Sequence, residues 1–129
     1  MWRRTERGSV TLEVAVLGPA LLLLVFAIVQ ASMWFYARNL ALAAAQEGVA
    51  AGRAYLADPG AATREAQAWL ERNAGDSLKG ASVSTASSGE LVRVEVSGRA
   101  LAVLPGWAGP TVTQSAEGPV ERFTVAGAP

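Results

Sequence analysis

The feature that most constrains this chain is an apolar run near its N-terminus, which covers residues 14–36. Its 23 residues include no ionisable side chain apart from the phenol of Tyr36. As an α-helix the run would be about 35 Å long at ~1.5 Å per residue, and the hydrocarbon layer of a bilayer is about 30 Å thick. The sequence therefore predicts one membrane-spanning helix.

The residues that flank this run predict its orientation. Three arginines lie within the first eight residues, whereas Trp34, Tyr36 and Arg38 mark the far end. Short cationic leaders stay in the cytoplasm, and amphipathic rings favour the membrane interface. We therefore expect a single-pass protein of the cell (inner) membrane, with residues 1–8 as a cytoplasmic basic leader, residues 9–37 crossing the membrane, and residues 38–129 outside the cytoplasm.

A cleaved secretory signal peptide is the main alternative for the same run. The apolar core of such a peptide usually has ~7 to 15 residues, fewer than are present here. The run also follows an acidic residue, Glu13, and small-x-small cleavage sites near its end are poor. The sequence favours a helix that remains attached to the protein.

Composition reduces the number of function classes that the rest of the chain can have. The 129 residues suffice for one modest domain, and the 11 basic and 11 acidic residues leave no positive field to attract nucleic acid. Cysteine and histidine are absent, which removes the usual ligands of zinc and the commonest general bases. We expect no cofactor, no metal, no nucleic-acid partner and no enzymatic activity. A paired-carboxylate hydrolase would need two scattered carboxylates to converge in a pocket, which the sequence leaves open but does not indicate.

The residues that precede the apolar run form a recognisable pattern. Arg7-Gly8-Ser9-Val10-Thr11-Leu12-Glu13 resembles the processing site of class III signal sequences in type IV pilin-like proteins. If Gly8 is the last leader residue, Ser9 becomes the first residue of the mature chain and Glu13 the fifth. Gly8 has no side chain, so an extended backbone there can enter a protease cleft at the membrane surface.

Glu13 can be explained in two ways. In the simpler one its carboxylate reaches the head groups and complements the positive end of the helix dipole, an interaction worth ~0.3–1 kcal/mol. In the other, the resemblance to pilins implies that the carboxylate pairs with the new α-amino group of a neighbouring subunit at the membrane boundary. Cleavage after Gly8 would create that amino group on Ser9.

The helix itself narrows the resemblance. Glu13, Pro19 and the leucine stretch at residues 21–24 resemble the N-terminus of TadE-like proteins, which are minor pseudopilins of tight-adherence (Tad/Flp) pilus systems. Residues 44–53 are similar to the alanine-rich segment of this family with its E-G-x-R-like core, although the arginine stands farther from the glycine than the family pattern places it. Residues 118–123 resemble the C-termini of actinobacterial-type members.

This resemblance implies a structural or assembly role in a Tad-type pilus or secretion system. It also implies partners: a prepilin peptidase that cuts after Gly8, other pseudopilins and a major pilin, and an inner-membrane assembly platform with its secretion ATPase. Whether the protein enters the pilus, primes its assembly or stays in the membrane is left open. The alternative is an unprocessed single-pass protein whose extracytoplasmic domain binds a ligand.

The remaining pattern predicts an α+β fold. The first helix should continue through Tyr55 or Leu56, with a total length of about 70 Å, and a second short helix should cover residues 61–74. Strands of a small antiparallel sheet are expected, in chain order, around Val83 and Thr85, at residues 91–97, at residues 111–116 and at residues 120–125. Within the second strand Val92, Val94 and Val96 should face the core.

Two further segments carry expectations about packing. Ala44, Gly48 and Gly52 are spaced by four, which lets another backbone approach the helix closely. We expect this strip to pack on the protein's own domain rather than on a second copy, and we assign Pro19 to helix packing with it. The apolar residues 101–110 should form a loop that places Leu104 or Trp107 on the core, the alternative being a patch that binds a partner.

Overall fold

The structure is a computed structural model, which describes residues 2–54, 58 and 60–121, and side chains from residue 8 onward. Within these residues, two helices, one short 3₁₀ turn and three strands follow one another. They are α1 (Trp2–Arg53), α2 (Ala61–Asn73), η1 (Gly75–Ser77), β1 (Leu78–Ser87), β2 (Leu91–Ala100) and β3 (Thr111–Pro119). This arrangement confirms the predicted α+β class with a long N-terminal helix, a second short helix and a small antiparallel sheet.

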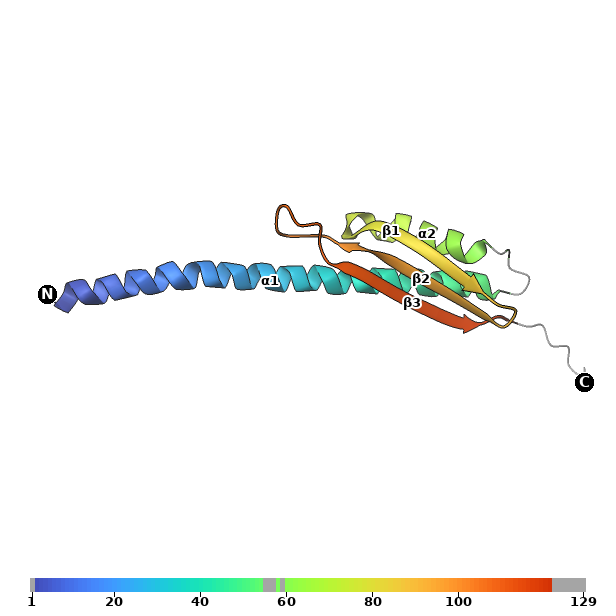
Figure 1. Ribbon diagram of the computed structural model, residues 1–129, viewed down its shortest axis with the longest axis horizontal. Helices are drawn as coiled ribbons and strands as arrows, with labels where there is room; N and C mark the ends of the chain where they lie inside the picture. Colours follow the sequence, from blue (N-terminus) through green and yellow to red (C-terminus); the bar gives the residue numbers. More distant parts are fainter. Residues whose placement is uncertain (1, 55–57, 59, 122–129) are drawn as a thin grey trace, which may run out of the picture.

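Helix α1 has 52 residues and is therefore about 78 Å long. Figure 1 shows it as one rod, whose N-terminal half projects away from the molecule while its C-terminal half lies along the sheet. Burial along the helix begins at Ala37, and none of its most apolar 18-residue window is buried. The helix passes through Pro19 without ending. The predicted end at Tyr55 or Leu56 lies outside the described residues.

The sheet has the order β1-β2-β3, with both pairs of neighbouring strands antiparallel. Val92, Val94 and Val96 are buried, whereas Arg93 on the opposite face is exposed, as the alternation in the sequence predicted. Val83 pairs with Val96 across β1 and β2 and so lies on the same inner face. Both helices cover that face, and the other face of the sheet is open (Figure 1).

The third strand is longer than the sequence indicated. Residues 111–116 form a strand as expected, but β3 continues through Gly118 to Pro119 where a turn was expected. The strand predicted at residues 120–125 is wrong at Val120 and Glu121, which lie beyond β3, and residues 122–125 lie outside the described residues. Pro119 is compatible with a strand because β3 is at the edge of the sheet, where a missing N–H breaks no ladder.

The glycine at position 118 is explained by packing against α1, not by a turn. A Cβ atom built on it would lie 2.7 Å from Cδ of Arg53 and 3.1 Å from Cγ1 of Val49, both on α1. A side chain at this position would therefore require the side chains of Arg53 and Val49 to shift, or β3 to move away from the helix. The glycine allows close contact between α1 and the sheet, and nothing local to the β3 sequence reveals this requirement.

The loop between β2 and β3, residues 101–110, also departs from expectation. Leu104 is 49% exposed and Trp107 is 46% exposed, so neither side chain fills the core. The loop leaves the end of the sheet and lies beside α1 at Gln30, beyond the point at Ala37 where the core begins. At that level α1 is exposed or half-buried, so the domain has no core there for the two side chains to fill.

Ala44, Gly48 and Gly52 on α1 face the protein's own domain. Ala44 is fully buried, and a Cβ atom added to Gly48 would lie 2.9 Å from the carbonyl oxygen of Ala62 on α2 and 3.2 Å from Cγ1 of Val94 on β2. Gly52 is equally close to Ala62. Pro19 is exposed, so its assignment to helix packing stays a prediction about another molecule.

The Gly48→Ala variant should lower the free energy of unfolding of the domain. Alanine normally stabilises a helix by about 1 kcal/mol relative to glycine, but overpacking against the backbone of Ala62 costs about 1–3 kcal/mol, so we expect a net loss of roughly 1 kcal/mol. Thermal unfolding of the full chain in detergent micelles, followed by near-UV circular dichroism, measures this. Gly18→Ala is the matched control, because nothing lies within 4 Å of a Cβ atom there. Equal unfolding temperatures for the two variants would contradict the packing role of Gly48.

Candidate functional site

Within the part of the chain that the structure describes, no group of three or more Asp and Glu side chains could hold a metal ion, and no polar or charged side chain is buried. Glu13 and Glu47 lie on α1, and the other described carboxylates lie on turns, on the outer side of α2 and on the open face of the sheet, in contact with water. The residues that the sequence analysis singled out lie along α1.

Gly8 and Ser9 are exposed and form part of α1. The sequence suggested an extended backbone at Gly8, and the structure instead has a continuous helix through it. Glycine is about 1 kcal/mol less favourable than alanine in a helix interior, which makes this turn easier to open than its neighbours. A Cβ atom at Gly8 would meet no described atom within 4 Å, so the domain does not cover this turn.

Glu13 is exposed on the same helix, between Val10 and Leu17, which are 59% and 51% exposed. It is the only acidic residue from Gly8 to Gln46. Its carboxylate forms no ion pair with any side chain that the structure describes. A carboxylate on an otherwise apolar helix surface is costly to place near lipid without a partner.

Gln30 was not singled out in the sequence, and it joins the apolar half of α1 to the domain. Its side-chain Nε2 donates to the carbonyl oxygen of Leu101 at 3.0 Å, and its Oε1 accepts from the backbone N–H of Val103 at 2.9 Å. Both ends of the amide are therefore used by the loop between β2 and β3. The available signal was that Gln30 is the only amide side chain in the run 14–36, where a polar group needs a hydrogen-bond partner.

Arg38, expected only to close the apolar run, joins α1 to β3. Its guanidinium lies 4.8 Å from the ring centre of Trp34 and 5.9 Å from that of Phe35. The amide oxygen of Gln114, in the orientation that satisfies both side chains, accepts from Nε at 2.9 Å and from Nη2 at 3.2 Å. These contacts set the helix against the third strand at the level where burial begins.

Arg53 makes the corresponding contact at the other end of the domain. Its Nε donates to the carbonyl oxygen of Pro119 at 2.7 Å, and its own carbonyl oxygen accepts from the N–H of Glu121 at 2.8 Å. The arginine of the E-G-x-R-like segment thus holds the C-terminal end of α1 against β3. Glu47 of the same segment is exposed.

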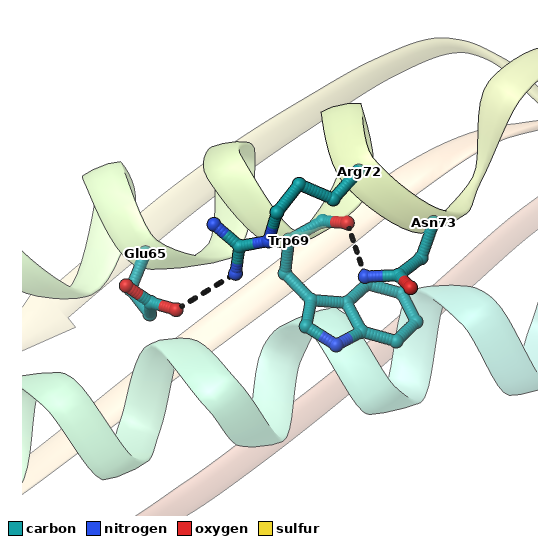
Figure 2. Close-up of polar contacts among 4 residues, drawn as sticks. All are labelled: Glu65, Trp69, Arg72 and Asn73. Carbon is teal, nitrogen blue, oxygen red and sulfur yellow. Dashed lines mark hydrogen bonds and ion pairs between the residues drawn. The ribbon is translucent and has the colours of Figure 1, made fainter.

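Helix α2 covers the remaining part of the inner face. Figure 2 shows the ring of Trp69 directed from α2 toward α1, where it packs against the core. Asn73 donates from Nδ2 to the carbonyl oxygen of Trp69 at 2.9 Å, and Arg72 and Glu65 form an exposed ion pair at 3.3 Å. Because exposed pairs of this kind contribute little to stability, these polar groups indicate a solvated helix face rather than a site.

Comparison with known proteins finds a family match for the N-terminal part of the chain. Residues 8–50 match the model of the family described as TadE-like protein. The match covers the apolar half of α1 together with Glu13, Pro19, Ala44 and Gly48, and it confirms the resemblance that the sequence suggested. No curated protein and no solved structure matches the chain.

The Arg38→Met variant should loosen the junction between α1 and β3. It removes two hydrogen bonds to Gln114 and the contact with the Trp34 ring, so we expect a loss of about 1–2 kcal/mol in the free energy of unfolding. Hydrogen exchange of the β3 amides in the micelle-bound full chain reports this directly. Arg93→Met is the control, since Arg93 is exposed and lies 3.9 Å from its partner Glu95. If β3 is as well protected in Arg38→Met as in Arg93→Met, the junction does not depend on Arg38.

Proposed function

Since residues 8–50 are TadE-like, we propose that this protein is a membrane-anchored, pseudopilin-like assembly component of a Tad-type pilus or secretion system. The observation that carries the proposal is the long α1 helix, half of which is covered by the domain and half of which is bare and apolar. Such a helix fits association with lipid and with other helices. It does not offer a pocket for a substrate.

The bare half of α1 supports anchoring in the membrane. Large apolar side chains are exposed all along residues 10–29. In water they would expose far more continuous apolar surface than a soluble monomer tolerates, whereas in a bilayer they match the surrounding lipid. We place residues 1–8 in the cytoplasm, residues 9–37 in the membrane and residues 38–129 outside, with the protein in the cell (inner) membrane.

Processing after Gly8 is the second part of the proposal. Cleavage there by a prepilin peptidase would remove the basic leader and leave the apolar helix attached to the domain. The exposed position of Gly8 and the weak helix propensity of glycine support access to the bond. The mature protein would begin with the α-amino group of Ser9.

The third part concerns Glu13. Its carboxylate has no described side chain to neutralise it, and the helix places it one turn beyond Ser9. The α-amino group of Ser9 on another pilin-like subunit would supply the missing positive charge, in a region where water competes weakly for both groups. We infer partners of the same helical class, namely other pseudopilins and a major pilin, together with an assembly platform and its secretion ATPase.

Determination of the mature N-terminus tests the processing step. Mass spectrometry of protein extracted from membranes of cells with an active prepilin peptidase should find Ser9 as the first residue. Gly8→Leu should leave the leader attached, because the added side chain blocks entry to the protease cleft, whereas Val10→Leu should be processed normally. Recovery of the intact chain from Met1 would reject the pseudopilin assignment and leave an unprocessed, membrane-anchored binding module.

The Glu13→Ala variant separates anchoring from assembly. The variant should remain in the membrane fraction, since the apolar run is unchanged, but cross-linking to partner pilins and surface piliation should fall to near background. Glu47→Ala is the control, because Glu47 is an exposed acidic residue on the domain half of the same helix. Normal piliation in cells with Glu13→Ala would remove the role assigned to this carboxylate.

A further inference from the structure

The loop between β2 and β3, residues 101–110, has an unusual composition for an exposed segment. Its sequence, LAVLPGWAGP, contains no charged residue and no polar side chain apart from the indole N–H. Leu104 and Trp107 are 49% and 46% exposed, although nothing in the core of the domain requires them to face outward. Exposed apolar side chains in a loop held away from the core indicate contact with another apolar surface, outside the domain.

The position of the loop along α1 indicates what that neighbour is. The two hydrogen bonds from Gln30 fix Leu101 and Val103 at the level of residue 30. Gln30 lies inside the apolar run, six residues before Tyr36 and thus about 9 Å along the helix axis from it. Figure 1 shows the loop extending from the sheet toward the bare half of α1. If Trp34, Tyr36 and Arg38 mark the membrane interface, the loop lies at or just below that interface.

The backbone of the loop sets a limit on depth. Gly106 and Gly109 have φ angles of +80° and +88°, which gives the tight reversal, and the N–H of Ala100 donates to the carbonyl oxygen of Pro110 at 3.0 Å. Irregular backbone is not tolerated in contact with the hydrocarbon layer but is compatible with the hydrated interface or with a covering of protein. Next to α1, Gln30 bonds the backbone of Leu101 and Val103. The exposed side chains of Leu104 and Trp107 would therefore be the parts of the loop that enter the lipid.

The charges beside the loop agree with this placement. Lys79 and Arg99, which are paired in the register of β1 and β2, line a hollow of about 450 Å³ together with Trp107. The exposed carboxylate of Asp76 on η1 lies at the same end of the sheet. Cations are present at the opposite end as well, where Arg93 lies across from Glu117 in the register of β2 and β3 and Arg53 contacts Pro119. What distinguishes Lys79 and Arg99 is their place at the end of the sheet nearest the bare helix, beside the apolar loop.

We propose that the loop is a second membrane contact, in which Leu104 and Trp107 enter the interface of the outer leaflet while Lys79 and Arg99 face lipid phosphates. This inference rests on the proposed anchoring of α1 in the membrane. Tryptophan prefers this interface because its ring is apolar and its N–H can remain hydrated. One helix alone leaves the domain free to rotate about the helix axis. A second contact through the loop fixes which side of the domain faces the membrane.

Site-directed fluorescence tests the contact in the full chain. The protein has no cysteine, so Leu104→Cys carries a single environment-sensitive nitrobenzoxadiazole label after reconstitution into vesicles of phosphatidylcholine and phosphatidylglycerol. We expect a blue-shifted emission maximum and strong quenching by lipids with a nitroxide in the upper acyl chain. Labels at Leu23→Cys, in the middle of the bare helix, and at Glu117→Cys, at the opposite end of the sheet, provide the membrane and aqueous references.

The three labels separate failure of this inference from failure of the proposed anchoring. If the Leu104→Cys label behaves like the one at Glu117→Cys while the one at Leu23→Cys is shielded from water, the loop contact is overturned and the anchor stands. If the Leu23→Cys label is also exposed to water, the anchoring itself is wrong. Both Leu104 and Glu117 are exposed, so neither substitution removes core packing.

Two variants of the Leu104→Cys protein test the residues that position the loop. Gln30→Leu removes both hydrogen bonds to the loop, and it should reduce quenching of the Leu104→Cys label while quenching at Leu23→Cys stays constant. Replacing Lys79 and Arg99 with serine should abolish the added quenching that phosphatidylglycerol gives over phosphatidylcholine alone. Unchanged quenching in the first variant would overturn the role of Gln30, and in the second the role of the two cations.

Discussion

The structure depends on one unbroken helix, α1, whose N-terminal half is bare and apolar and whose C-terminal half is covered by the domain. Over residues 10–29 α1 presents large apolar side chains on all sides, and from Ala37 onward it presents alanine, glycine and valine to a domain. Because an α-helix has a fixed rise per residue, the residue number of each contact gives its distance along the axis from the apolar half. Contacts at Gln30, Arg38 and Arg53 place the loop, the middle of β3 and the end of β3 in order along the rod. These three contacts fix the loop and β3 along the rod, and the apolar core holds α2 and β2 against the same helix.

Small side chains on α1 explain why so short a chain can build a domain. Ala41, Ala44 and Ala45 are fully buried, and Gly48 lets the backbone of α2 approach almost to contact. The sheet completes the core with valines on its inner face, together with Leu78 and Ala100. The cost is that the core is thin, with no buried polar group in the described residues. In the described residues the polar and charged side chains are therefore all at least partly exposed, on the surface of the domain.

Much of the fold could be predicted because its signals are local. The apolar run sets the first helix, and the alternation of Val92, Val94 and Val96 sets the inner face of β2. Gly118 and Pro119 were misjudged because a Gly-Pro pair between two apolar segments normally indicates a turn. Here the glycine is required by α1, which is more than sixty residues distant in the chain. A requirement of that kind cannot be read from neighbours in the sequence.

The same distinction applies to the candidate site. Gly8 and Glu13 stand out in the sequence because their spacing and their position at the start of an apolar helix are local features, and the family match covers both. The importance of Gln30 depends on Leu101 and Val103, over seventy residues away, so only its unusual polarity was visible. The apolar loop was assigned to the core for a related reason. An apolar side chain in the sequence predicts burial but does not show which surface covers it. Here Leu104 and Trp107 are about half exposed, beside the bare half of α1 and not in the core.

These positions constrain how the helix can meet its neighbours. Close to Ser9 and Glu13 every side of α1 is open, so a second helix can approach from any direction and bring opposite charges together at the start of the rod. At Gln30 one side is occupied by the loop, and beyond Ala37 the domain covers the side that bears the small residues. The freedom of approach therefore narrows steadily from the N-terminus to the domain. Under the proposed pairing through Ser9 and Glu13, a neighbouring subunit would have to pass the loop on its free side. The domain would then limit the arrangements that the apolar half alone permits.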